Sequence, residues 1–415
     1  MSRNHNRVLW VLTPLLLVLS QAAPAQKFYT YVGDIGTDHV LLAWGTTEGE
    51  NTIGRSSASH GPAVVKIDGK EIKVSDQNWT AISGLKPDTQ YSYEVYLEGK
   101  IIGKAQIKTW PEKAEKLRFF VIGDFGSGDS NQREVAAAML QEFQRHGSDN
   151  PVRFVITTGD NLYGNLGFTL RFNNTGDKDT HWESRFFEPY ETIVARIPFY
   201  PSLGNHDGNE TESRGDLDAY LDNFFFPAHK PSRYYRFSFG GFADFFALDS
   251  STNSQTGPPR PAYSAGGDQH KWMQLNLAES RVPWKIPFFH HPPFNAGPRH
   301  PAVAQGLSHF LDVFKKTDVK VVFTGHEHNF QFSRKNAATG NIRYIVSGAG
   351  GELRTGNVRR SMNQSEIEGW APILHFLSVE IEGKEMRIMP ISPEPFEMVR
   401  SDGRKVQLPL RITLD

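Results

Sequence analysis

Five short segments of this 415-residue sequence each place a metal-binding type of side chain directly after a predicted strand. They are Gly123-Asp124-Phe125-Gly126, Gly159-Asp160-Asn161-Leu162-Tyr163, Gly204-Asn205-His206-Asp207, Phe289-His290-His291-Pro292 and Gly325-His326-Glu327-His328. The side chains offer carboxylate, phenolate, amide oxygen and imidazole ligands but no thiolate, a mixture that suits iron, zinc or manganese rather than a structural zinc site. Their joint occurrence predicts one two-metal site built from several strands of a rigid sheet.

The sequence around these segments alternates between strands and helices. Leu117–Ile122 and Val152–Thr157 are apolar runs that predict buried strands, and each leads into an aspartate segment. Between them, Asn131 and Glu134 fit a capping box at the start of a helix. Functional sites of such α/β folds gather at the carboxyl ends of the strands, so we expect the five segments to converge.

Residues 26–111 follow a different pattern, in which short runs alternate apolar and polar side chains between turn residues. This pattern predicts an all-β sandwich, with Trp44 in its core and a tight hairpin at Asp68-Gly69. Leu85–Tyr91 resembles the corner of fibronectin type III domains, in which a tyrosine hydroxyl bonds to nearby backbone. The domain holds no cluster of candidate ligands, which predicts a supporting or interacting role.

The amino-terminal 25 residues predict a secretory signal, with a basic start, a short apolar run and small residues at Ala23-Pro24-Ala25. No later segment reaches the roughly 20 apolar residues of a membrane span. The sequence has no cysteine, hence no disulfides, and a chain of this size can be stable without them. We therefore expect a secreted or periplasmic protein that begins near Gln26. The net charge of −1 favours neither nucleic acid nor an anionic membrane as a partner.

The five segments resemble those of the calcineurin-like metallophosphoesterases, and in detail those of the purple acid phosphatases. Most metallophosphoesterases have a histidine ligand two residues after the first aspartate, where this sequence has Gly126. The purple enzymes instead place a tyrosine three residues after the second aspartate, as Tyr163 is here. A phenolate is a hard anionic ligand, so the resemblance implies that the first metal is Fe(III).

The resemblance carries over to seven ligand positions. Asp124, Tyr163 and His328 resemble the ligands of the ferric site. The divalent ion (Zn, Fe or Mn) would take Asn205, His290 and His326, with Asp160 as the bridging carboxylate. In the pair His290-His291, only the first histidine fits the family pattern of histidine, any residue, proline.

Two further histidines are candidate catalytic residues. His206 follows the amide ligand and resembles the histidine that faces the substrate phosphate in the family. His300 lies ten residues after His290, near the position of another pocket histidine of the purple enzymes, with a surface role as the alternative. Either imidazole could bind the phosphate and protonate the leaving oxygen. His291 is a third candidate for the pocket.

The resemblance implies a four-layer α/β/β/α sandwich of two mixed sheets over residues 117–390, followed by a carboxyl-terminal extension at 391–415. It also implies that phosphate monoesters are hydrolysed by attack of a metal-bound hydroxide. One alternative is a phosphodiesterase or nucleotide hydrolase, which would differ in the pocket around His300 and Gly208-Asn209. The other is a cell-surface binding protein with a decayed metal site, which the full set of ligands argues against. Arg354 and Arg359 follow a glycine-rich stretch and could touch a substrate, although its glycines also suit tight turns.

Overall fold

The computed structural model describes residues 26–47, 52–147, 149–163, 181–207, 222–225, 232–251 and 263–414. The predicted signal sequence and Gly208-Asn209 lie outside these residues. Within them, no helix has the length and hydropathy needed to cross a membrane.

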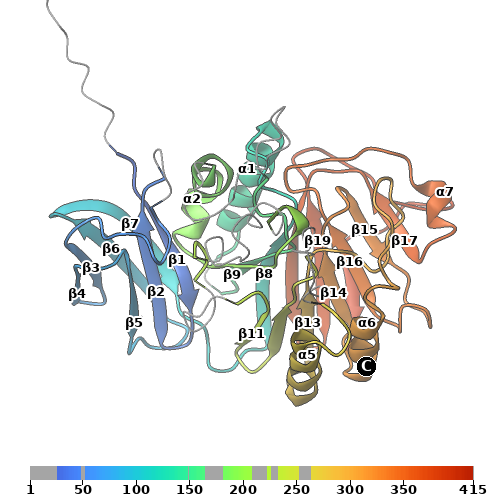
Figure 1. Cartoon of the computed structure of the whole chain (residues 1–415), viewed down its shortest axis with the longest axis horizontal. Coiled ribbons are helices and arrows are strands. Elements are labelled where there is room, and N and C mark those ends of the chain that lie inside the picture. The colour runs from blue at the N-terminus through green and yellow to red at the C-terminus, as the bar shows by residue number, and fades with distance from the viewer. Residues whose placement is uncertain are drawn as a thin grey trace, which may run out of the picture.

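The amino-terminal region is a sandwich of two antiparallel sheets, drawn in blue at one end of the molecule in Figure 1. One sheet has the order β1 (Tyr29–Ile35), β2 (His39–Gly45), β5 (Trp79–Ser83). The other has the order β4 (Lys70–Val74), β3 (Ala63–Ile67), β6 (Gln90–Leu97), β7 (Lys100–Lys108). This confirms the predicted all-β sandwich, and three strands facing four fit the fibronectin-like resemblance.

Local features of this sandwich also follow the sequence. Asp68 and Gly69 both have positive φ (52° and 71°) and join β3 to β4 as a two-residue hairpin. The Tyr91 hydroxyl accepts a hydrogen bond from the Lys86 backbone N–H at 2.7 Å, which confirms the predicted corner. Trp44 is fully buried.

The rest of the chain forms two mixed sheets that pack face to face. The six-stranded sheet has the order β10 (Phe199–Pro201), β9 (Val152–Thr157), β8 (Lys116–Ile122), β18 (Phe376–Glu382), β19 (Glu385–Ile391), β21 (Leu410–Thr413). The eight-stranded sheet has the order β11 (Tyr235–Phe239), β12 (Ala243–Ala247), β13 (Trp284–Phe288), β14 (Val321–Thr324), β16 (Arg343–Ser347), β15 (Phe330–Ser333), β17 (Ile367–Ala371), β20 (Val399–Arg400). Phe119 of the first sheet packs edge-on against Phe245 and Phe323 of the second. The residues after 391 thus add one strand to each sheet.

Helices cover the outer faces of both sheets, which confirms the predicted four layers (Figure 1). The described helices are α1 (Ser130–Arg145), η1 (Glu183–Phe187), α2 (Glu188–Val194), α5 (Asp268–Glu279), α6 (Ser308–Lys316) and α7 (Arg359–Met362). The buried residues of α5 and α6 pack in one cluster with Phe246, Val322 and Tyr344 of the eight-stranded sheet.

The cap of α1 differs from the prediction. The helix begins one residue before Asn131, and its N-cap is Asp129, whose carboxylate accepts the Gln132 backbone N–H at 3.1 Å. The capping box at Asn131 and Glu134 is therefore wrong. Asp129 is an equally good cap, and the preceding turn, closed by a hydrogen bond from Gly128 N–H to the Gln132 side chain, selects it.

The sandwich and the two-sheet region share one continuous hydrophobic core. Trp110, at the end of the sandwich, packs against Phe154, Tyr200 and Phe239 of the six- and eight-stranded sheets. Polar contacts reinforce this packing, since buried Arg153 binds the Asp88 carboxylate at 2.8 Å. The two regions are thus fastened together rather than loosely linked.

Candidate metal centre

Each of the five segments follows the carboxyl end of a strand, as the sequence predicts. Asp124 comes after β8, Asp160 after β9 and Asn205 after β10, while His290 follows β13 and His326 follows β14. The first three strands are parallel neighbours in one sheet, and the last two are parallel neighbours in the other. Asp124, Asp160 and His326 have positive φ (55°, 49° and 70°), a strained conformation in which the chain turns sharply at the strand end.

The three side chains expected at the ferric site lie together. The Tyr163 hydroxyl is 3.4 Å from Asp124 Oδ1 and 3.3 Å from His328 Nε2. His328 Nε2 is in turn 3.3 Å from the same Asp124 oxygen. Asp124 is fully buried and His328 nearly so. The three ligand atoms therefore surround one point, although they come from segments about 200 residues apart.

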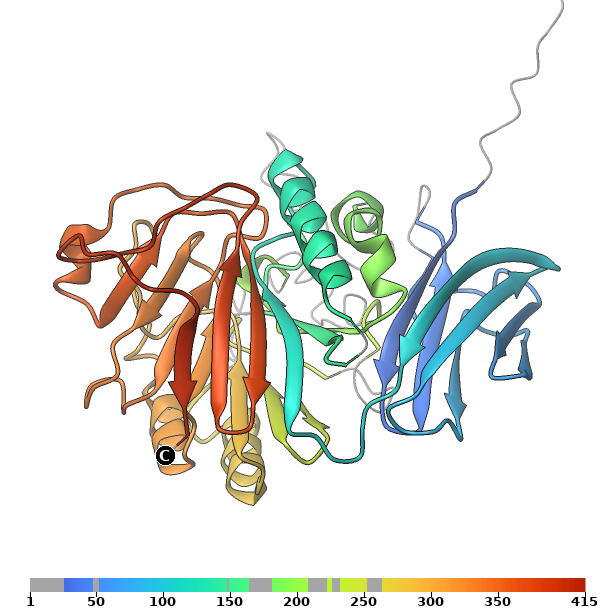
Figure 2. The ribbon, with the colours of Figure 1, turned by 180° about the vertical axis from the view of Figure 1, so that it is seen from behind.

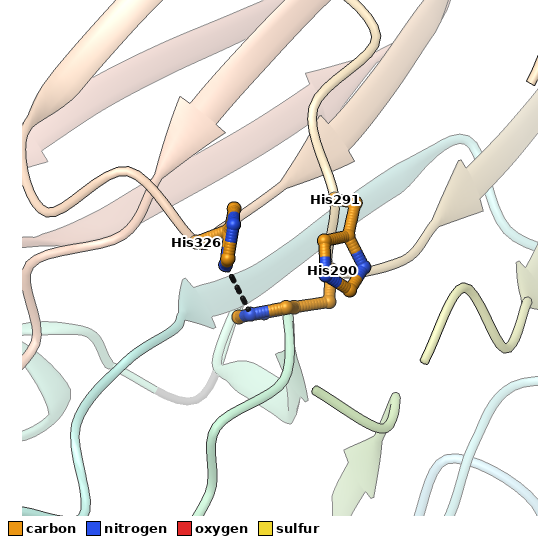
Figure 3. Close-up of side chains that lie close together, drawn as sticks. All are labelled: His290, His291 and His326. Carbon is orange, nitrogen blue, oxygen red and sulfur yellow. Dashed lines mark hydrogen bonds between the residues drawn. The ribbon is translucent and has the colours of Figure 1, made fainter. Parts of the chain in front are cut away.

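The three side chains expected at the divalent site also meet. His290 Nε2 lies 3.0 Å from Asn205 Oδ1 and 3.1 Å from His326 Nδ1. Figure 3 shows the rings of His290 and His326 with these nitrogens facing each other. Asp160 adjoins both groups: its Oδ2 is 3.3 Å from His290 Nε2, and ligand atoms of Asp124, Asp160 and His290 all lie within 4.8 Å of one another.

The donor set fits a cation. His290 Nδ1 is 2.8 Å from the Thr158 carbonyl, which accepts its proton and leaves the Nε2 lone pair facing the oxygens of Asn205 and Asp160. In this neutral tautomer Nε2 and the oxygens face one another as acceptors, so a positive charge at Nε2, whether a proton or a metal ion, is favoured. Burial lowers the pKa of His290, but the carboxylates of Asp160 and Asp124 outweigh it and raise the pKa to about 9. A proton and a metal ion would compete for this nitrogen.

The surroundings of Tyr163 also favour a bound cation. Its burial, and then the carboxylates of Asp124 and Asp160, raise the pKa of the phenol well above its usual value. A phenolate at this position therefore requires a bound cation to compensate for its charge. Gly126 leaves no room for a histidine, because a Cβ there would lie 2.0 Å from the Asn161 carbonyl oxygen. The two loops approach closely enough for the Tyr163 backbone N–H to donate to the Gly126 carbonyl at 3.0 Å.

The candidate catalytic histidines line the same centre. The His206 backbone N–H donates to Asp160 Oδ1 at 2.9 Å, and its ring meets that of Tyr163 edge-on at 4.6 Å. His300 stacks on His326, with ring centroids 4.0 Å apart. The ligand atoms of His291 lie within 4.8 Å of those of His290 and His326, so this histidine also belongs to the cluster (Figure 3). Burial, and then His290, lower the pKa of His291 to about 3, which keeps it neutral.

Asp207 is a site residue that the sequence reasoning missed. It is fully buried and accepts hydrogen bonds from the backbone N–H groups of Asn161 and Gly204 at 3.0 and 2.9 Å. It thus ties the second ligand segment to the third. Burial, and then the charge of Asp160, raise the pKa of Asp207 to about 7. The available signal was an acidic residue directly after the proposed ligand Asn205 and the candidate catalytic residue His206.

A second missed group holds the loop that carries His300. Buried Glu327 accepts the His300 backbone N–H at 2.7 Å. Buried Gln331 accepts the Ala296 backbone N–H at 2.9 Å and donates to the Gly297 carbonyl at 2.8 Å. The available signal was a period of two, because Glu327, Asn329 and Gln331 occupy alternate positions from the fifth ligand segment into β15.

Comparisons with known proteins agree with this geometry. Residues 117–330 match the family model described as calcineurin-like phosphoesterase. Purple acid phosphatase 3 of Arabidopsis thaliana is 27% identical over 296 residues, which cover 67% of this chain and 75% of that protein. The Fe(3+)-Zn(2+) purple acid phosphatase 12 of the same plant is 26% identical over 64% of this chain and 54% of its own length.

Two solved structures have a similar fold. The purple acid phosphatase PPD1 from yellow lupin superposes with a TM-score of 0.66 at 15% identity, covering 92% of this chain and 73% of that one. PhoD superposes with a TM-score of 0.62 at 14% identity and covers 92% of both chains. The similarity in fold thus extends over most of the chain, including the amino-terminal sandwich.

Proposed function

The chain belongs to the calcineurin-like phosphoesterase family, and from this we propose that it hydrolyses phosphate monoesters as a purple acid phosphatase does. One observation supports the proposal most: seven side chains of the ligand types of purple acid phosphatases meet at the ends of five strands. The pairing of Gly126 with Tyr163 supports the purple subgroup in particular, since it exchanges one ligand position for another.

We further propose the metals and their ligands. Asp124, Tyr163 and His328 would hold Fe(III), because a buried phenolate beside a carboxylate favours a hard, highly charged cation. Asn205, His290 and His326 would hold a divalent ion, with Asp160 shared between the two. When bound, the two ions would supply the Lewis acid that lowers the pKa of an attacking water and stabilises charge on the phosphoryl group.

The chain's own residues would bind the substrate and move the proton. His206 lies beside Asp160 and Tyr163, where its imidazole would contact the phosphoryl oxygens and donate to the leaving oxygen. Among the described residues, His300 makes hydrogen bonds only through Nδ1, which leaves Nε2 for the substrate. The ordered network of Glu327 and Gln331 would fix His300 in that position.

Residues 1–25 have the pattern of a signal sequence, so the proposed site of action is outside the cytoplasm, in the periplasm or the medium. Small phosphate esters are the proposed substrates.

The proposal is tested with purified protein loaded with iron and zinc, by measuring phenyl phosphate hydrolysis against pH together with metal content. We expect hydrolysis with an acidic optimum. His206→Ala should keep both metals and lower kcat by about 10²–10⁴-fold, whereas Asp160→Asn should lose metal as well as rate. Asp312→Asn, at an exposed position on α6, is the control. Full metal occupancy without hydrolysis of any monoester would refute the proposal.

A further inference from the structure

The segment after β16 crosses over the ligand loops. The backbone N–H of Gly351 donates to the Asp124 carbonyl at 3.0 Å, and that of Arg354 donates to the His328 carbonyl at 2.8 Å. Gly351 is required here, because a Cβ would lie 2.5 Å from the Phe125 carbonyl oxygen. The glycine-rich stretch thus serves close backbone approach, and it delivers Arg354 to the edge of the centre.

The Arg354 side chain contacts a candidate catalytic histidine. Its Nη1 is 3.1 Å from Nδ1 of His300, the histidine that stacks on His326. Its backbone is held by the loop of His328, a ligand proposed for the other metal. Arg354 therefore lies near the ligands of both proposed metals.

The guanidinium of Arg354 is only partly used. In the part of the chain that the structure describes, no carboxylate lies within 4.0 Å of it, and its single side-chain hydrogen-bonding contact is with His300. A guanidinium has five N–H donors and keeps its charge at all relevant pH values. The remaining donors of this partly exposed side chain are thus available to an anionic ligand.

We propose that Arg354 is a substrate-binding residue that grips the phosphoryl group and selects dianionic monoesters over monoanionic diesters. The proposal rests on the proposed function. An arginine fork matches the spacing of two phosphoryl oxygens, and its attraction grows with their charge. A diester still offers two free phosphoryl oxygens, but it carries one negative charge in place of two, so it attracts the guanidinium less.

The test compares Arg354→Gln, Arg354→Lys and the control Arg281→Gln, an exposed arginine that precedes β13, at the opposite end of that strand from His290. The substrates are phenyl phosphate and methyl phenyl phosphate, which share one leaving group. We expect Arg354→Gln to lower kcat/KM for the monoester by about 10- to 100-fold and for the diester by less than about threefold. Arg354→Lys should recover part of the loss, because it keeps the charge but not the fork. An equal loss on both esters would overturn the selection.

A second measurement does not depend on turnover. The dissociation constant of inorganic phosphate, measured by calorimetry on the metal-loaded proteins, should rise about 10-fold or more in Arg354→Gln and stay unchanged in Arg281→Gln. Equal phosphate affinity in the wild type and Arg354→Gln would refute Arg354 as a phosphoryl ligand. If the wild type hydrolyses neither ester while Arg354→Gln still weakens phosphate binding, the proposed function fails and the anion site remains.

Discussion

Gly126 and Tyr163 act as one unit at the scale of single residues. The Cβ that Gly126 lacks would collide with the Asn161 carbonyl, and the same close approach lets the Tyr163 backbone bind the Gly126 carbonyl. The motif made this exchange predictable, because ligand residues are read by identity and spacing. The roles of Glu327 and Asp207 were not predictable in the same way, since they depend on neighbours that only the folded chain brings close. For Arg354 the sequence indicated a possible contact with substrate but did not separate it from Arg359.

Tyr163→Phe tests the proposed phenolate. The iron-loaded wild type should absorb visible light through charge transfer from the phenolate to Fe(III), and the variant should lose this band while it keeps its fold. Absorption spectroscopy with circular dichroism as the fold check measures both. Tyr93→Phe, a buried tyrosine of the sandwich, is the matched control and should leave the colour unchanged. A band that persists in Tyr163→Phe would contradict the purple assignment.

His375 predicts how stability depends on pH. It is fully buried between the Ile373 carbonyl and the Ser347 hydroxyl, and burial lowers its pKa from 6.5 to about 4. Between pH 6.5 and about 4, the His375 imidazole is protonated in the unfolded chain and neutral in the folded chain. The free energy of unfolding is therefore unaffected by this group above pH 6.5, and it decreases by up to about 3 kcal/mol as the pH falls toward 4.

The measurement is the free energy of unfolding of the wild type and of His375→Gln by denaturant titration at several pH values. We expect the difference between the two proteins to shrink as the pH is lowered through this window, because glutamine does not titrate. A constant difference would show that His375 is not the group responsible.

At the scale of elements, the sequence predicted the strands and the ligands that follow them, because each apolar run ends in a polar motif. The start of α1 did not, because Asp129 and Asn131 are both good caps and only the turn at Gly128 decides between them. The sequence also did not show that a polar side chain of β15 holds the loop of a candidate catalytic histidine. Gln331 reads as an ordinary strand residue in the sequence, yet it holds the loop of His300 through the backbone of Ala296 and Gly297.

The substitution Gln331→Leu tests whether Gln331 holds the loop of His300. The substitution leaves the Ala296 N–H and the Gly297 carbonyl without this partner, which should cost about 1–3 kcal/mol of stability. Because His300 loses its fixed position, kcat/KM for phenyl phosphate should fall while both metals stay bound. Gln274→Leu, on the exposed face of α5, makes the same chemical change away from the site and should affect neither quantity. Unchanged kinetics in Gln331→Leu would show that the loop holds itself.

At the scale of the whole molecule, we expect the sandwich and the two-sheet region to unfold together, because they share one hydrophobic core. Calorimetry of the full chain should show a single transition whose measured enthalpy equals the van't Hoff enthalpy. Trp110→Ala should destabilise that one transition by about 3–5 kcal/mol, because it empties the contact with Phe154 and Tyr200. Val65→Ala, a fully buried valine of β3 in the other sheet of the sandwich, is the comparison. Two separate transitions would mean that the regions are independent.

The pairing of β8 with β18 has a consequence for synthesis (Figure 2). β8 carries Asp124 at its end, yet one of its two neighbours lies more than 250 residues later in the chain. Until the ribosome has released residues 376–382, β8 presents an open edge of unpaired backbone groups that invites association with other chains. The six-stranded sheet therefore cannot form completely until residues 376–382 have been synthesised. A chain cut short before residue 376 would contain every proposed ligand and still lack the strand that pairs with β8.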